Sequence, residues 1–231
     1  MNQQQVGVAQ MTTAMALSGG VGLWATWAAL PSFSVVFWRC LFGFVALLGF
    51  MLCTGRIHKG WLTRSQLLWS LAAGTTLVLN WVCFFQSFHY VSIGVATIVY
   101  QAQPLLVVVG GMAFFQERMG LNRWLWLGLG LVGMVMLVLA RGGVSLSGDH
   151  YLLGIALSLA AATFYAAGTL IAKRMPKTPA TSVTLMQVLV GMAIMLPFGA
   201  LGNVPQTSLQ WLSVVMLGVV NTAVMMSLVY A

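Results

Sequence analysis

The sequence predicts an all-α polytopic membrane protein. Of its 231 residues, 60% are hydrophobic and only 5% are charged, whereas soluble domains carry about a quarter charged residues. So few charges cannot cover a solvated surface, which excludes a water-soluble enzyme or binding module, and the high hydrophobicity excludes a disordered chain. The apolar residues form continuous blocks of about 20 residues, typical of membrane-spanning helices, not the alternating segments of about 10 residues found in barrels.

Eight such blocks, separated by short polar breaks, predict eight transmembrane helices. The first block is expected to be retained as a helix, because Met1–Gln5 lacks the basic residues that open a signal peptide. In chain order the predicted spans are Val8–Leu30, Ser34–Cys53, Leu67–Phe88, Val91–Phe115, Trp124–Ala140, Leu152–Ala172, Thr181–Leu201 and Trp211–Ala231.

The basic residues gather in the breaks after the second, fourth and sixth spans. These breaks, all on one predicted side, hold Arg56, Lys59, Arg64, Arg118, Arg123, Lys173, Arg174 and Lys177. The opposite side holds only Arg141. Because cytoplasmic loops are enriched in Lys and Arg, the protein is expected in the inner (cytoplasmic) membrane with its N-terminus in the cytoplasm. Apart from Arg39, which lies inside the second span, the basic residues lie between spans, so the net charge of +8 indicates a lipid bilayer as partner and not nucleic acid.

The three cysteines predict neither a disulfide nor a metal site. Cys40, Cys53 and Cys83 are an odd number and lie in or at the edge of predicted spans. We expect them to pack as small hydrophobic side chains. The sequence implies no cofactor.

Comparison of the chain with itself predicts an inverted repeat of five helices. Two matched pairs of segments carry it: Ala16–Ser18 with Ala156–Ser158, and the pattern Ser34-Val35…Arg39…Gly43 with Ser182-Val183…Gln187…Gly191. A weaker match pairs Gly74 with Gly218, 144 positions apart. Because five is odd, the second copy enters from the opposite side of the bilayer.

The copies are expected to be residues 1–141 and residues 142–231. At the Gly74/Gly218 offset, Ala231 corresponds to Ser87, whereas the first copy extends to Ala140. The second copy is therefore expected to lack two helices, about 53 residues. The predicted fold is thus eight helices of an expected ten, and the sequence predicts a truncated chain whose parent has ten.

Several motifs resemble those of one transporter family. They are Ser87–Ala96, the step Gln103-Pro104-Leu105-Leu106, Phe114–Met119, Arg39 within Phe37-Trp38-Arg39, and the glycines from Gly128 to Gly133. Together they resemble the drug/metabolite transporter superfamily, EamA type, although Gln116 stands where the family has a glycine. The resemblance implies ten helices in two EamA repeats around a central substrate cavity. Its members transport amino acids, other metabolites and drugs, so it does not fix the substrate.

Polar and aromatic side chains inside the spans are the candidate substrate-binding residues, because intramembrane polar groups face the bundle interior or a water-filled cavity. Arg39 either contacts a substrate carboxylate or phosphate, or reaches the headgroups or pairs with carbonyls. The amides either contact substrate or link neighbouring helices. The remaining candidates are Asn80, Gln86, Gln101, Gln103, Gln187 and Asn221, with Trp24, Tyr100 and Tyr165 as walls.

Pro104 and the Glu117–Arg118 pair are expected to act as a kink and a gate. Proline removes a helical hydrogen bond, and Gln101 and Gln103 flank the resulting kink. Two positions apart, these amides lie on different faces, so at most one is expected to meet substrate. Glu117, at the end of the fourth span, opposes the helix dipole. It is expected to pair with a nearby arginine such as Arg118 in a structural turn or cytoplasmic gate.

The expected function is secondary transport, by alternating access, that exports a small metabolite such as an amino acid, or a drug. The alternative is a truncated, non-transporting or regulatory subunit that assembles with another chain, and a homodimer is a further option. An enzyme is not expected, because the sequence offers no acid–base or nucleophile pair. No Asp or Glu lies well inside a span, which disfavours proton or cation exchange at a central glutamate.

Overall fold

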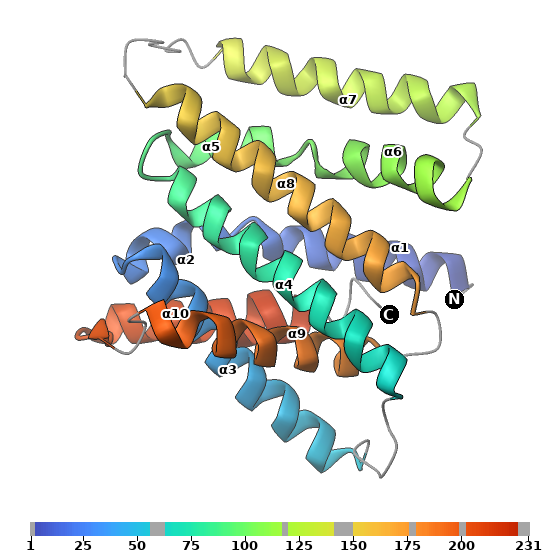
Figure 1. Cartoon of the computed structure of the whole chain (residues 1–231). Coiled ribbons are helices and arrows are strands. Elements are labelled where there is room, and N and C mark those ends of the chain that lie inside the picture. The colour runs from blue at the N-terminus through green and yellow to red at the C-terminus, as the bar shows by residue number, and fades with distance from the viewer. Residues whose placement is uncertain are drawn as a thin grey trace. The chain divides into compact units, whose positions relative to one another are not determined.

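A computed structural model describes residues 3–55, 63–116, 120–140, 150–175, 179–198 and 202–225. These described residues are helical and contain no strand (Figure 1). The elements are α1 (Gln3–Ser18), α2 (Val21–Ala28), α3 (Ser32–Cys53), α4 (Arg64–Ser87), α5 (Ile93–Tyr100), α6 (Gln103–Phe115), α7 (Leu121–Ala140), α8 (Tyr151–Lys173), α9 (Ala180–Met195), η1 (Leu196–Phe198), α10 (Ser208–Gly218) and η3 (Val219–Val224).

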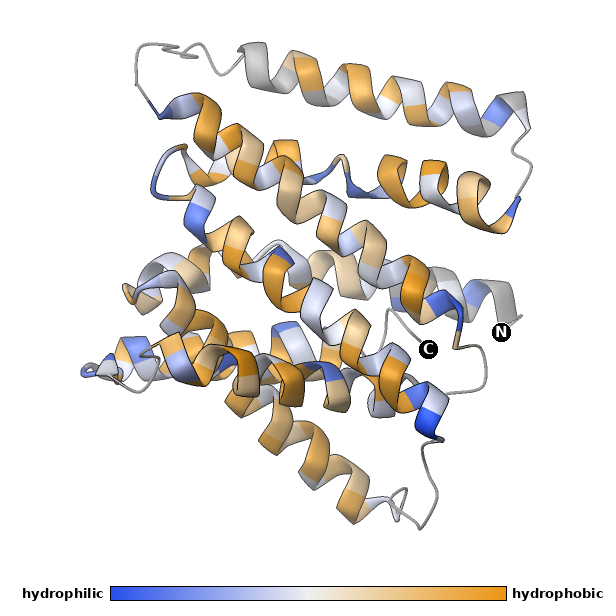
Figure 2. Cartoon of the chain, viewed as in Figure 1, coloured by the Kyte–Doolittle hydropathy of each residue, from blue (hydrophilic) through white to orange (hydrophobic). Residues whose placement is uncertain are grey.

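A helix, or a helix broken in two, lies at each predicted apolar block. Figure 2 shows hydrophobic residues along the lengths of these helices and hydrophilic ones mainly at their ends and breaks. Within the described residues, five helical segments are long and apolar enough to cross a membrane: Ser32–Cys53, Arg64–Ser87, Ile93–Phe115, Tyr151–Lys173 and Thr181–Phe198. The chain is therefore a multi-pass membrane protein, and the count of eight spans stays a prediction.

The first predicted span, Val8–Leu30, is two helices instead of one. α1 ends at Ser18, and α2 begins at Val21 after a turn at Gly19 and Gly20. Glycine costs about 0.5–1 kcal/mol relative to alanine inside a helix, so a glycine pair is a natural place for a break. α2 in turn ends at Ala28, and the next residue, Ala29, has a left-handed backbone (φ 48°).

The fourth predicted span is also interrupted, between α5 and α6. The amides of Gln101 and Ala102 close α5 with hydrogen bonds of 3.1 Å to the carbonyls of Ile98 and Val99, each three residues earlier. Pro104 then lies in the first turn of α6. There its missing N–H costs nothing, because the first amides of a helix have no intrahelical acceptor. The proline therefore restarts the helix after a turn.

The last described helix changes its winding partway. α10 begins at a capping box, in which Thr207 and Gln210 satisfy each other's backbone amides. After Gly218 the chain continues as the π-helical segment η3. The hydroxyl of Thr222 donates to the carbonyl of Leu217, five residues earlier, at 2.8 Å. Such π-segments are rare in proteins, and those that occur are frequently found at functional sites.

The chain forms two compact units. The first unit comprises Met1–Val78 and Arg174–Ala231, and the second comprises Leu79–Lys173. In the first unit, α3 packs against α9 and α10, and α2 packs against α10. In the second unit, α8 packs against α5 and α6, and α5 contacts α7.

Two glycines allow close helix packing in the first unit. A Cβ on Gly74 of α4 would lie 3.1 Å from the Cα of Gln187, and one on Gly218 would lie 2.8 Å from the carbonyl oxygen of Arg39. The Cβ added to Gly74 would also lie 2.9 Å from the Cβ of Val190, three positions after Gln187. The one added to Gly218 would lie 2.5 Å from the Cβ of Phe42, three positions after Arg39. Both contacts leave no room for a side chain.

Two further glycines make a second pair of close contacts. A Cβ on Gly43 of α3 would lie 3.2 Å from the Cγ2 of Thr222, and one on Gly191 of α9 would lie 3.1 Å from the Cγ2 of Val78. Gly43 and Gly191 are the glycines matched in the predicted repeat. These four glycines therefore set the spacing of α3, α4, α9 and α10 within the first unit.

Candidate functional site

Arg39 is the centre of a buried polar network in the first unit. Its side chain, on α3, is only 2% exposed. Its Nε donates to the hydroxyl of Thr222 at 2.7 Å, and its Nη2 donates to the carbonyl of Asn221 at 3.0 Å. A buried charge needs such partners, because an unpaired one is strongly destabilising. The guanidinium thus contacts protein acceptors in η3, and a contact with substrate stays a prediction.

Asn221 extends this network to the break in the first helix. Its Nδ2 donates to the carbonyl of Leu17 at 2.6 Å, where the last carbonyls of α1 lack intrahelical donors. Its Oδ1 is buried and has no hydrogen-bond partner among the described residues. Two irregular helix segments, the end of α1 and η3, are therefore linked to each other and to α3 by Asn221 and Arg39.

Trp24 lies on α2, next to this break. Its indole packs edge-to-face against Trp27, with ring centroids 5.4 Å apart. A Cβ on Gly20 would lie 3.2 Å from its Nε1. Trp24 is half-buried, and its indole lies close to Gly20 in the turn between α1 and α2.

Asn80 and Tyr100 form a second polar cluster, in the second unit. Asn80 of α4 is fully buried, and its Nδ2 donates to the hydroxyl of Tyr100 at 3.0 Å and to the carbonyl of Ala161 at 2.7 Å. The Tyr100 ring lies 4.4 Å from that of Phe84 and 6.2 Å from that of Tyr165, between centroids. The cluster therefore ties α4 to α5 and α8, just before the break that follows α5.

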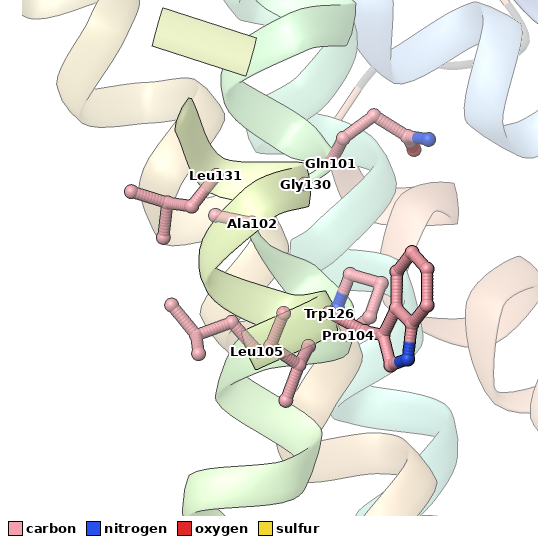
Figure 3. Close-up of a pocket in the computed structure, with 8 residues that line it drawn as sticks. Gln101, Ala102, Pro104, Leu105, Trp126, Gly130 and Leu131 are labelled. Carbon is pink, nitrogen blue, oxygen red and sulfur yellow. The ribbon is translucent and has the colours of Figure 1, made fainter. Parts of the chain in front are cut away.

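A groove lies beside this break in the second unit. Its volume is about 370 Å³, and Figure 3 shows the side chains of Gln101 and Trp126 on one side of the view and those of Leu105 and Leu131 on the other. Its lining residues are Gln101, Ala102, Pro104, Leu105, Trp126, Leu127, Gly130 and Leu131. Gln101 is exposed at this groove, so a polar amide borders an otherwise apolar surface.

Gln103 has a different environment from Gln101. It is only 8% exposed, and its Oε1 has no hydrogen-bond partner in the part of the chain that the structure describes. The two amides thus occupy different surroundings, Gln101 in the turn after α5 and Gln103 at the start of α6. Which of them meets a substrate stays a prediction.

The remaining candidates are placed separately. Gln187 of α9 is 1% exposed, and neither its Nε2 nor its Oε1 has a hydrogen-bond partner among the residues described. Gln86 is half-buried on α4. Glu117 and Arg118, the predicted gate, lie outside the described residues, as do the loop cations Arg56, Lys59, Arg141 and Lys177.

Sequence reasoning missed several residues of these networks. Thr222 accepts from Arg39, yet threonine in an apolar helix is usually bonded to its own helix. Its position beside Asn221 is the one available signal. Thr181 and Thr184, both buried on α9, were also missed. They could have been identified by the spacing of three positions from Thr181 to Thr184 and from Thr184 to Gln187.

Comparison with known proteins identifies the family. The EamA-like transporter family matches residues 5–139 and 152–231. The uncharacterized transporter YxxF of Bacillus subtilis (strain 168) is 31% identical over 226 residues, which are 96% of this chain and 71% of YxxF. One crystal structure of a protein, at 19% identity, has a TM-score of 0.77 and covers 98% of this chain and 77% of its own. At that identity it shows a shared fold alone.

The family match confirms the resemblance seen in the sequence motifs. It also points to transport and not to catalysis, since both the family and YxxF are described as transporters. The chain belongs to the EamA-like transporter family.

Proposed function

We propose that this protein is a secondary transporter that exports an amino acid or a similar small metabolite by alternating access. Family membership supports a role in transport. The observation that supports the mechanism is the pairing of the glycine contacts in the first unit. That pairing follows the register of the sequence repeat.

The contacts of one copy have counterparts in the other. Gly74 and Gly218 are 144 positions apart, and so are Val78 and Thr222; Arg39 and Gln187 are 148 apart, and so are Phe42 and Val190. A Cβ on Gly74 would meet Gln187 and Val190, and a Cβ on Gly218 would meet their counterparts Arg39 and Phe42. In the same way, a Cβ on Gly191 would meet Val78, and a Cβ on Gly43 would meet its counterpart Thr222. Corresponding glycines thus approach corresponding residues.

This correspondence supports an inverted repeat of residues 1–141 and 142–231 whose helices interleave. Inverted repeats suit alternating access, because each copy can adopt the conformation of the other and so open the site to the opposite side. The same proposal places the protein in the inner membrane with a cytoplasmic N-terminus, as the basic loops predict. Association into a homodimer is a further part of it, which the molecular mass of the protein in detergent tests.

Solute counterflow tests the proposed function without knowledge of the coupling ion. Protein in liposomes is preloaded with one unlabelled amino acid at a time, and uptake of the same labelled amino acid is measured. An alternating site accelerates uptake into preloaded vesicles, and we expect this for at least one of the twenty standard amino acids. Protein-free liposomes and vesicles without internal solute are the controls. Failure of every amino acid to show counterflow would contradict the proposal.

A further inference from the structure

α9 carries a buried polar stripe with unsatisfied groups. Thr181, Thr184 and Gln187 recur every three positions, which places them along one side of the helix. Their exposed fractions are 7%, 0% and 1%. Within the described residues, the hydroxyl of Thr181 and both polar atoms of the Gln187 amide have no hydrogen-bond partner. An unpaired buried polar group costs about 1–3 kcal/mol, so it requires an explanation.

The contacts of α9 show where Gln187 lies. A Cβ on Gly74 of α4 would approach the Cα of Gln187 to 3.1 Å. A Cβ on Gly191, one turn further along α9, would meet the Sγ of Cys40 on α3 and the Cγ2 of Val78 on α4. Because residues four apart share a helix face, Gln187 lies at the seam of α9 with α3 and α4. This seam joins the two copies of the proposed repeat.

Gln187 differs from Arg39, its counterpart in the first copy. Arg39 donates to the carbonyl of Asn221 and to the hydroxyl of Thr222, both in η3. The residues 144 positions before Asn221 and Thr222 are Leu77 and Val78, two apolar residues of α4. The first copy therefore offers Gln187 no equivalent of the Thr222 hydroxyl, and the Leu77 carbonyl lies within the helix α4.

We propose that Gln187 contacts the transported solute, and that the solute carries a neutral carboxamide or hydroxyl group at this point. This inference rests on the proposed transport function. A carboxamide has one donor group and one acceptor, so it can form paired hydrogen bonds with another amide or with a hydroxyl. It cannot neutralise a charge, and burying an uncompensated charge beside it is costly.

Cysteine labelling tests the location of Gln187 without any solute. In a variant with Cys40→Ala, Cys53→Ser and Cys83→Ser, Gln187→Cys is compared with Val188→Cys, a neighbour that is also fully buried (0% exposed). We expect a small water-soluble thiol reagent to modify the cysteine at position 187 at least tenfold faster than that at 188, because transport opens the seam to solute. Equal protection of the two positions would overturn the inference.

A second variant separates function from stability. In Gln187→Leu the unsatisfied amide is replaced by an apolar side chain, so the thermal midpoint is expected to stay constant or rise. Counterflow of glutamine is expected to fall at least tenfold. The wild type is expected to prefer glutamine over glutamate and lysine by at least tenfold.

The outcomes distinguish this inference from the function on which it rests. If the wild type shows no counterflow of any amino acid, the transport function fails. If the wild type transports but Gln187→Leu transports glutamine equally well, the contact at Gln187 is refuted. A wild type that prefers glutamate or lysine refutes the solute class alone.

Discussion

At the scale of single residues, the hydroxyl of Thr222 is the side-chain acceptor for the buried Arg39 guanidinium, beside the backbone carbonyl of Asn221. In Thr222→Val the shape is kept and the 2.7 Å hydrogen bond to Nε is lost. A hydrogen bond to a charged group contributes about 1.5–3 kcal/mol, so we expect a loss of that size, measured as a lower free energy of unfolding in detergent. Thr163→Val is the control, because the exposed Thr163 hydroxyl bonds only the carbonyl of Leu159 in its own helix. Equal stability of the two variants would contradict the network.

Two tyrosines in the second unit make a matched pair. The Tyr100 hydroxyl exchanges hydrogen bonds with Asn80, at 3.0 and 3.4 Å. The buried Tyr151 hydroxyl has no hydrogen-bond partner among the residues that the structure describes. Tyr100→Phe is expected to cost about 1 kcal/mol of unfolding free energy, whereas Tyr151→Phe is expected to be neutral or stabilising. Thermal unfolding of both variants checks this, and the opposite order would show that the Asn80 cluster contributes nothing.

At the scale of helices, the sequence predicts which segments are helical better than it predicts where they break. The apolar blocks are long and uniform, so their helical state follows from composition. Pro104 gave a local signal for the interruption between α5 and α6. The π-turn of η3 had no such signal, because Val219–Val224 reads as ordinary apolar helix and its winding is accompanied by a bond to Arg39, 183 positions away. Contacts of that range are absent from any local pattern.

Glycine packing is an element-scale property that substitution can test. In Gly218→Ala the new Cβ would lie 2.8 Å from the carbonyl oxygen of Arg39 and 2.9 Å from the backbone nitrogen of Gly43, and backbone atoms cannot move aside cheaply. We expect a loss of about 1–3 kcal/mol from overpacking. Gly49→Ala on α3 is the control, since a Cβ at this position would have no neighbouring atom from elsewhere in the described structure within 4 Å. That variant should be stabilised by about 0.5–1 kcal/mol. A Gly218→Ala protein as stable as Gly49→Ala would contradict the close approach of α3 and α10.

At the scale of the whole molecule, composition was sufficient to predict a membrane protein, and the motifs were sufficient to predict its family. The contacts within the candidate site could be identified only from the structure. Arg39 and Asn221 were both selected as isolated polar residues in apolar helices. Their partnership was not predictable, because 182 positions separate the two residues that the guanidinium–carbonyl bond joins. Gln187 was selected in the same way, and its lack of a partner within the described residues is a property of the packed helices that sequence does not carry.

The loop charges predict the orientation of the chain in the membrane, and this prediction can be tested at the two ends of one helix. Ser65, in the first turn of α4, and His89, two residues beyond its last residue, are both exposed. The length of α4 at about 1.5 Å per residue exceeds the roughly 30 Å of a bilayer core. The basic break before α4 predicts a cytoplasmic Ser65 and an external His89. With the native cysteines replaced, a membrane-impermeant maleimide added to intact cells is therefore expected to label His89→Cys, and to label Ser65→Cys only after permeabilisation. The reverse pattern would place the N-terminus outside, and labelling of both variants in intact cells would show that α4 does not span the membrane.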